Sequence, residues 1–296
     1  ESLDDLEKLT ALTSLALYFS SLTNIDLSKN PGLTSLIMYG IGSSKISVDV
    51  SNYTALTSLI LHGIQLTNID LRNNIELTEL TLTNNLLENI DISNNTSLIA
   101  LNITDNNISN INLDNNKELT ELNLSKNDFS NIGLSNYTQL THLNLSENNL
   151  SIIDLSSNIA LTTIGLSGNQ LTSFDVTNNI KLESLSAGNN QLNDIDIRNN
   201  PALSYLNLSN TGSSGFYSGC TSIYILTSTL QQPGNQFTNI DVSNNTVLTS
   251  LKLNNIQLTE IDVSNNTALA MLELINNNIT SIDVSNAKAL THLNLA

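Results

Sequence analysis

The chain has 296 residues, of which 40% are hydrophobic and only 12% are charged, and its formal net charge at pH 7 is −17. A surface this acidic repels phosphate backbones and anionic membranes, so we expect no nucleic-acid partner. No apolar run approaches the roughly 20 residues that cross a bilayer, which argues against direct membrane insertion. The single cysteine, Cys220, cannot form an internal disulfide.

A 21-residue period runs along the whole sequence. Residues 56–76, 77–97 and 140–160 align on one template, L-x-x-L-x-L-x-x-N-x-L-x-x-I-D-L-x-x-N-x-x. The leucines that open the template depart from this spacing twice: Leu33 and Leu56 are 23 residues apart, and Leu203 and Leu248 are 45 apart. A fixed period of this length indicates a solenoid of stacked turns.

The template predicts the shape of each turn. Its L-x-L segment, for example Leu80 and Leu82, alternates apolar and polar residues, as a strand with one buried face does. The second half also alternates, with Ile69 and Leu71 expected inside and Asp70 outside. The predicted fold is therefore an α/β-class leucine-rich-repeat solenoid that is nearly all β. We expect about 14 stacked turns, a parallel main sheet, a second column of short extended segments, gentle curvature and little or no helix.

We expect one solenoid domain over residues 1–296. Residues 1–11 imitate the second half of a turn and 290–296 stop after a strand, which suggests a fragment of a longer protein. Residues 203–247 are interpreted as two irregular turns, because Cys220-x-x-Ile223-x-Ile225 matches the strand pattern. In this register Cys220 is a buried, inert side chain.

Asparagines recur at two places in the template. The asparagine at template position 9 lies where the strand ends, so its amide can bond backbone groups of its own and the neighbouring turn. The paired asparagines at positions 18 and 19 suit tight turns that tolerate left-handed backbone. Both sets are interpreted as structural. The position 9 residues are Asn85, Asn106, Asn127, Asn148, Asn169 and Asn190.

The repeat at 248–268, LTSLKLNNIQLTEIDVSNNTA, resembles the 21-residue leucine-rich repeat of bacterial surface proteins, in particular that of internalin-type adhesins. The likeness covers essentially the whole chain. At template position 6 the resembled repeat has a ladder of cysteines, whereas this chain has residues such as Leu61, Leu82 and Ile103. The resemblance implies a secreted or wall-anchored bacterial protein that binds a host, matrix or cell-surface partner.

A ladder of aspartates occupies template position 15, with Asn112 and Gly133 as a break in it. Carboxylates stacked at the spacing of neighbouring strands repel one another, so their pKa values are expected above the ordinary ones. A column of calcium ions would relieve the repulsion, but an extended segment offers few of the six to eight oxygens that calcium takes. Hydrogen bonds from neighbouring Ser and Asn are the structural alternative. The ladder residues are Asp26, Asp49, Asp70, Asp91, Asp154, Asp175, Asp196, Asp241, Asp262 and Asp283.

Residues that could support catalysis are few. His62, His142 and His292 are several turns apart, so we expect no histidine metal cluster. His142 has Glu121 beside it and Ser146 further along its strand, but a hydrolase would need these groups within hydrogen-bond reach and an oxyanion site. A solvated pair on a regular sheet is the favoured interpretation.

The outward face of the predicted sheet changes character toward the N-terminus. Middle turns present polar residues such as Asn102 and Asn123, whereas three early turns present aliphatic and aromatic ones. Such a patch is typical of an interaction surface. Packing of a missing cap or a neighbouring domain is an equal alternative, because repeat arrays need capped ends. The candidate ligand-binding residues are Tyr18, Phe19, Ile37, Tyr39, Ile60, His62, Tyr205 and Tyr224.

The sequence therefore predicts a non-enzymatic protein-binding or adhesion module of a bacterial surface or secreted protein, which recognises its partner through the main sheet. We expect an extracellular or cell-surface monomer without cofactor or metal. The alternative is a scaffold array whose flanking domains carry the binding. A hydrolase that uses His142 and Glu121 ranks third.

Overall fold

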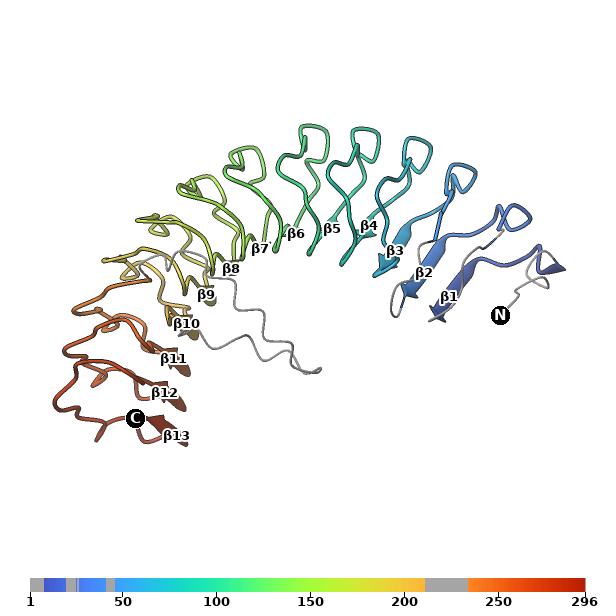
Figure 1. Ribbon diagram of the computed structural model, residues 1–296. Helices are drawn as coiled ribbons and strands as arrows, with labels where there is room; N and C mark the ends of the chain where they lie inside the picture. The colour runs from blue at the N-terminus through green and yellow to red at the C-terminus, as the bar shows by residue number, and fades with distance from the viewer. Residues whose placement is uncertain (1–7, 20–24, 26, 41–45, 211–233, 296) are drawn as a thin grey trace. The chain divides into compact units, whose positions relative to one another are not determined.

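The computed structural model describes residues 8–19, 25, 27–40, 46–210 and 234–295. They belong to two compact units, an N-terminal unit of residues 1–148 and a C-terminal unit of residues 149–296. Each unit is a stack of turns that contributes one strand per turn to a parallel sheet (Figure 1). No α-helix is assigned among the described residues. The predicted fold class, a nearly all-β leucine-rich-repeat solenoid, is confirmed.

In the N-terminal unit the seven strands follow one another in chain order, each hydrogen-bonded in parallel to the next. They are β1 (Ser14–Phe19), β2 (Ser35–Gly40), β3 (Ser58–His62), β4 (Glu79–Thr81), β5 (Ala100–Asn102), β6 (Glu121–Asn123) and β7 (His142–Asn144).

The C-terminal unit repeats the arrangement with six strands. They are β8 (Thr163–Gly165), β9 (Ser184–Ser186), β10 (Tyr205–Asn207), β11 (Ser250–Lys252), β12 (Met271–Glu273) and β13 (His292–Asn294).

The leucines of the template form the core of each unit. In the turn that contains β4, Leu77, Leu80 and Leu82 are all fully buried. The hydroxyl of Thr78 donates to the carbonyl of Thr57 in the preceding turn, 3.1 Å away. Apolar burial holds the interior together while a side-chain ladder supplements the backbone hydrogen bonds between turns. At template position 6, Leu61, Leu82 and Ile103 are fully buried, so leucine and isoleucine fill the slot where the resembled repeat has cysteine.

The asparagine at template position 9 makes the bonds predicted for it. Asn106 donates through Nδ2 to the carbonyls of Leu82, in the preceding turn, at 2.8 Å and of Ile103, in its own turn, at 3.0 Å. Its Oδ1 accepts a hydrogen bond from the backbone N–H of Leu87 at 3.0 Å. One buried amide therefore satisfies three backbone groups that stacking removes from water.

The left-handed backbone does not lie at the paired asparagines, which corrects the sequence interpretation. Positive φ recurs instead at template position 8, one residue before the buried asparagine. The chain turns there directly after the strand, and the backbone rather than the residue type sets the conformation, because Lys126 and Glu147 adopt it at φ values of 53° and 56°. Asn95, one of the paired residues, donates instead to the carbonyls of Leu71 and Asn74 in the preceding turn, at 3.1 and 2.8 Å.

The second half of each turn follows the predicted alternation. Leu71 is buried, Ile69 is half-buried and Asp70 is exposed. These segments form the second column, although none of them is assigned as a strand. They are joined sparsely, for example by the backbone N–H of Leu86, which donates to the carbonyl of Leu66 at 2.8 Å.

The described residues place no further strand of the sheet between residues 203 and 247 after β10, which differs from the two stacked turns expected there. Strand β10 pairs directly with β11, with Tyr205 opposite Ser250. Asn245 likewise donates to the carbonyl of Asn200 at 2.9 Å, although 45 residues separate them. Leu203 and Leu248 are 45 residues apart instead of 21, so the sequence carries an insertion here. The described residues give thirteen strands, not the predicted fourteen turns. Cys220 and the strand predicted from it lie outside the described residues.

Asn210 joins the two sides of this insertion. Its Oδ1 accepts a hydrogen bond from the backbone N–H of Asn235 at 2.8 Å, and its Nδ2 donates to the carbonyl of the same residue at 2.8 Å. Asn235 then takes the buried position 9 role, donating to the carbonyls of Ala187 and Leu208, both at 2.9 Å. The repeat therefore resumes after the insertion with its normal hydrogen bonds.

Candidate functional site

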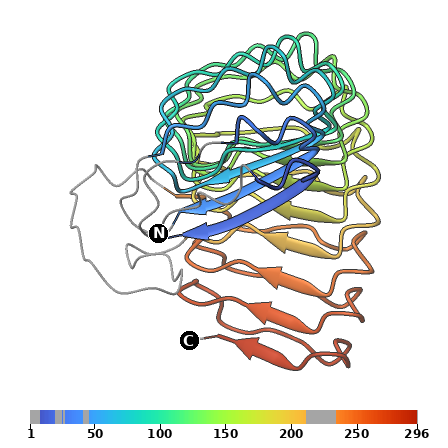
Figure 2. The same cartoon turned by 90° about the vertical axis from the view of Figure 1, so that its right-hand side faces the viewer.

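The first three strands of the N-terminal unit are longer than the others. Strands β1 and β2 have six residues and β3 has five, whereas every other strand among the described residues has three. The longer arrows are visible in Figure 2. The outward face of the sheet is consequently widest where the sequence predicted an apolar and aromatic patch.

An aromatic row crosses these three strands. Tyr18 is opposite Tyr39 in the strand register, and their rings are stacked, with centroids 5.1 Å apart and planes 3° apart. The ring of His62 follows, with its centroid 5.2 Å from that of Tyr39 and a tilt of 40°. His62 Nδ1 lies 2.8 Å from the hydroxyl of Thr83, so a hydrogen bond orients the imidazole. Tyr18 is 70% exposed at the end of the row.

An aliphatic row lies beside the aromatic one. Ala16 is opposite Ile37, which is opposite Ile60. Ile37 and Ile60 are half-buried on the outward face, while their strand neighbours Leu36 and Leu59 are fully buried in the core. We call the surface formed by Tyr18, Ile37, Tyr39, Ile60 and His62 the N-terminal patch.

Three candidate residues lie elsewhere. Phe19 follows Leu15 and Leu17 in the alternation of β1, so it projects to the side opposite Tyr18. Tyr205 is half-buried in β10 between Ser184 and Ser250. Tyr224 lies outside the described residues. The structure therefore brings together five of the eight candidates.

The polar middle of the same face uses much of its hydrogen-bonding capacity internally. Asn102 Oδ1 accepts hydrogen bonds from both the backbone N–H of Thr104, at 3.1 Å, and its hydroxyl, at 2.7 Å. Ser125 makes the same pair of bonds to Asn123 at 3.1 and 2.7 Å. These side chains are held by their own strands, which leaves the N-terminal patch as the distinctive part of the face.

His142 and Glu121, the residues considered for a hydrolase, are not arranged for catalysis. His142 and Glu121 are opposite one another in neighbouring strands, but among the described residues they share no hydrogen bond. His142 Nδ1 instead lies 2.9 Å from the hydroxyl of Thr141. An imidazole that is not oriented by the acid has no means of activating a serine in the way that a triad does.

The aspartate ladder is exposed and locally hydrogen-bonded. Asp91 Oδ1 accepts a hydrogen bond from the backbone N–H of Ser93, two residues on, at 3.0 Å, which closes an Asx turn. Asn112 makes the same bond with the N–H of Asp114 at 2.8 Å. The predicted hydrogen bonding from neighbouring serines is confirmed. Among the described residues, no group of three or more His, Cys, Asp or Glu is placed to hold a metal ion.

The expected rise in pKa is wrong in sign at eight ladder residues: Asp49, Asp70, Asp91, Asp154, Asp196, Asp241, Asp262 and Asp283. Hydrogen bonds from the side chain and backbone of Ser93 lower the pKa of Asp91, and those from Ser264 lower the pKa of Asp262. The repulsion between neighbouring carboxylates opposes these bonds but is weaker. In two turns an arginine strengthens the effect: Arg72 lowers the pKa of Asp70 to about 2 by a fork of two bonds at 3.0 and 2.7 Å.

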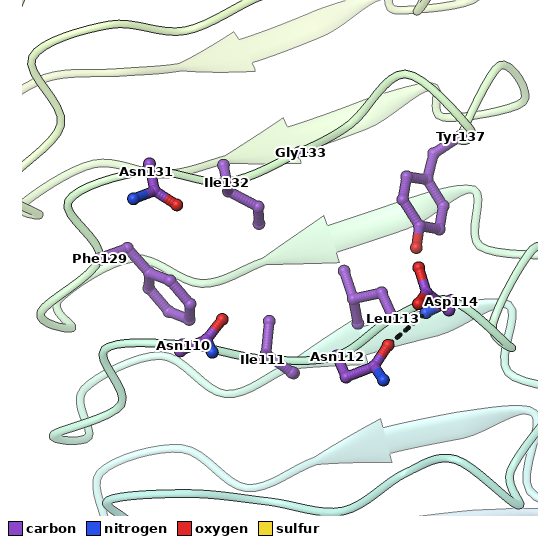
Figure 3. A pocket seen from close by; sticks show the side chains of 10 residues that line it. All are labelled: Asn110, Ile111, Asn112, Leu113, Asp114, Phe129, Asn131, Ile132, Gly133 and Tyr137. Carbon is purple, nitrogen blue, oxygen red and sulfur yellow. Dashed lines mark hydrogen bonds between the residues drawn. The ribbon is translucent and has the colours of Figure 1, made fainter.

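A pocket that the sequence analysis did not locate lies at the break in the aspartate ladder. It has a volume of about 310 Å³ and lies between the second halves of two adjacent turns of the N-terminal unit (Figure 3). Asn112 and Gly133, which interrupt the ladder, both line it. The break was visible in the sequence, but the pocket depends on how the two turns are packed together.

The fold is that of the leucine-rich-repeat proteins, and comparison with solved structures supports the resemblance stated on the sequence. The functional domain of InlJ from Listeria monocytogenes, which includes a cysteine ladder, is 30% identical over 99% of this chain, with a TM-score of 0.78. This chain spans 64% of the length of that structure.

Two further structures show the same fold. A leucine-rich-repeat protein of Leptospira interrogans has a TM-score of 0.83 and 22% identity, over 100% of this chain and 75% of its own. The internalin inlF of L. monocytogenes has a TM-score of 0.75 and 22% identity, over 98% of this chain and 89% of its own. This chain therefore has the leucine-rich-repeat fold that these internalin and other bacterial structures share.

The other comparisons found no similarity. No family model matches the sequence, and no curated protein matches it. Among the described residues no helix is long and apolar enough to span a membrane.

Proposed function

We propose that the chain is a non-enzymatic protein-binding module and that the N-terminal patch is the surface that holds the partner. The observation that carries this proposal is the row of Tyr18, Tyr39 and His62 across the widest part of the sheet. Stacked rings give a large, rigid contact area, so little conformational entropy is lost when a partner covers them. The flanking isoleucines add apolar area next to the rings.

The strongly acidic charge of the chain and the exposed ring of Tyr18 together indicate which surface chemistry the partner should have. Because the formal net charge is −17, a partner surface with basic and apolar residues fits best. A guanidinium or ammonium group placed over the exposed face of Tyr18 would gain a cation–π interaction. Phosphate-rich polymers are disfavoured by the same charge.

The likeness to a domain of InlJ supports a bacterial surface or secreted setting for this module, acting in adhesion. The partner is then a protein or cell-surface molecule of the surroundings, and the chain acts as a monomer without a cofactor. The competing proposal is a scaffold array whose flanking domains bind. It is favoured if a neighbouring domain covers the N-terminal patch.

The test is binding of the whole chain to a panel of purified extracellular-matrix proteins and intact host-type cells, with surface plasmon resonance as the readout for the purified proteins. A variant carrying Tyr18→Ser, Tyr39→Ser and His62→Ser removes the aromatic row. We expect the wild type to bind at least one member, and the variant to lose about tenfold or more in affinity. A matched variant carrying Asn102→Ala, Asn123→Ala and Asn144→Ala alters the polar middle of the face and should bind as the wild type does.

Two results would contradict the proposal. The first is equal binding by the wild type and a well-folded variant without the aromatic row, which would favour the scaffold array. The second is the absence of binding between the wild-type chain and every member of the panel. Hydrolysis of generic ester or peptide substrates that His142→Ala abolishes would favour the third-ranked function instead.

A further inference from the structure

Several departures from the repeat template converge on one place in the N-terminal unit. Asn112 and Gly133 replace ladder aspartates in consecutive turns, Tyr137 replaces the buried asparagine of template position 19, and Phe129 stands where most turns have leucine. All four line the same pocket of about 310 Å³. Buried tyrosine and phenylalanine occupy the same two template positions elsewhere, at Tyr53 and Phe237, so the break at Asn112 and Gly133 is what distinguishes this place.

Gly133 adds no side chain to the edge of the pocket. A Cβ atom built at Gly133 meets no other atom within 4 Å, so the space outside this residue is open. Its φ is not among the positive values of the chain, so glycine is not required there by the backbone. An aspartate at this position, as in most turns, would place its carboxylate in the open space.

The polar groups around the pocket suit an uncharged ligand with many hydroxyls. Asn110 and Asn131 occupy the same template position in adjacent turns and line the pocket together (Figure 3). Within the described part of the chain their amides make no hydrogen bond, so each can both donate and accept. The ladder carboxylates are missing from both turns, which leaves Asp114 as the one charged residue among those that line the pocket.

Tyr137 and Asp114 form the other end of the pocket. The Tyr137 ring is buried, at 3% exposure, and its hydroxyl points toward the carboxylate of Asp114 (Figure 3). Burial and the charge of Asp114 raise the pKa of Tyr137, so the phenol stays neutral and can donate. Ile111 and Ile132 supply apolar wall between the two polar ends. The volume is at the small end of the range of about 300–1,000 Å³ for ligand sites.

We propose that this pocket is a saccharide-binding subsite for a neutral mono- or disaccharide. The amides of Asn110 and Asn131 and the carboxylate of Asp114 would bond the sugar hydroxyls, and the isoleucines would contact its C–H faces. This site is on the second half of the turns, separate from the N-terminal patch, so it does not depend on the function proposed for that patch.

The test is ligand-observed NMR and calorimetry of the whole chain with neutral sugars: glucose, galactose, N-acetylglucosamine and their β-linked disaccharides. Gly133→Asp restores the aspartate ladder and adds a carboxylate at the edge of the pocket. Asn131→Ala removes one amide. We expect at least one sugar to bind the wild type with a dissociation constant on the order of 1 mM, and both variants to lose about tenfold or more.

Asp91→Asn and the variant without the aromatic row are the controls, because both leave the pocket unchanged and should bind the sugar as the wild type does. Circular dichroism confirms the fold of each variant. The proposal is overturned if no sugar in the set binds, or if Gly133→Asp binds as well as the wild type. The proposal would also be overturned if acetate, phosphate or calcium bound saturably in the pocket near Gly133 while none of the sugars did.

Discussion

Asp91 accepts a hydrogen bond on Oδ1 from the backbone N–H of Ser93, 3.0 Å away. Asn112 makes the same bond one turn later, which shows that a neutral amide oxygen can take the place of the carboxylate. We therefore expect Asp91→Asn to leave the thermal unfolding midpoint close to that of the wild type, and Asp91→Ala to lower it. Differential scanning calorimetry of the two variants checks this. An equal decrease for both would mean that the charge itself matters.

The arginine forks in the ladder predict a specific acid sensitivity. The pKa values of Asp70 and Asp196 are lowered to about 2 by Arg72 and Arg198. A carboxyl group whose pKa is depressed in the folded state contributes stability that is full above its unfolded pKa, near 3.8, and is lost as the pH falls through the folded value. The unfolding midpoint should therefore decrease between about pH 4 and pH 2.

The double variant Arg72→Gln, Arg198→Gln tests the cause. Without the guanidinium groups the folded pKa values return toward the ordinary one, so the decrease across this pH window should become smaller. Carbon-detected NMR titration of the Asp70 carboxyl gives the same answer at one site. If the NMR titration gives the wild-type Asp70 carboxyl a pKa near or above 3.8, repulsion between the ladder carboxylates outweighs the hydrogen bonds.

The buried position 9 asparagine is expected to be the most sensitive polar residue of a turn. Asn106→Ala removes one acceptor and two donors and leaves the Leu87 N–H and the Leu82 and Ile103 carbonyls without that partner. We expect a loss of about 3 kcal/mol in the free energy of unfolding, measured by urea denaturation. Asn110→Ala, on the exposed side of the same turn, should change it by less than about 0.5 kcal/mol. Similar effects of the two would contradict the structural role of Asn106.

The left-handed turn after each strand gives a fourth prediction. Gly168 has a φ of 72°, so Gly168→Ala should cost about 1–2 kcal/mol of stability. Gly133→Ala is the matched control, because its backbone is not left-handed and open space surrounds it. We expect this control to be neutral or slightly stabilising. Chemical denaturation of both variants distinguishes backbone strain from a general cost of removing glycine.

Much of the fold could be predicted because each position of the template has the same structural role in every turn. The leucine spacing indicated the parallel sheet, and the position of Asn106 at the end of a strand indicated its backbone bonds. The left-handed position could not be predicted from residue preference, because Lys126 and Glu147 occupy it. The direct pairing of β10 with β11 could not be predicted, since Cys220, Ile223 and Ile225 match the strand pattern by residue type.

The site was predicted in part for a related reason. Register alone was enough to align Tyr18 with Tyr39 and Ile37 with Ile60, so the N-terminal patch followed from the template. Phe19 was misplaced because strand alternation was not applied to it. The pocket near Gly133 could not be inferred, since it arises from space between two turns. The pKa of Asp91 was misjudged because the spacing of carboxylates was weighed without the donors two residues away.

The central claim is that the N-terminal patch is the surface that a partner covers. Hydroxyl-radical footprinting measures this directly, because the rate of side-chain oxidation follows exposure and Tyr18 is 70% exposed in the free chain. The measurement compares Tyr18 in the free protein and in the complex with the panel member that binds most tightly, with Tyr205 as the internal reference. The account predicts that the oxidation of Tyr18 falls several-fold in the complex while that of Tyr205 stays unchanged. An unchanged rate at Tyr18 in a saturated complex would contradict it.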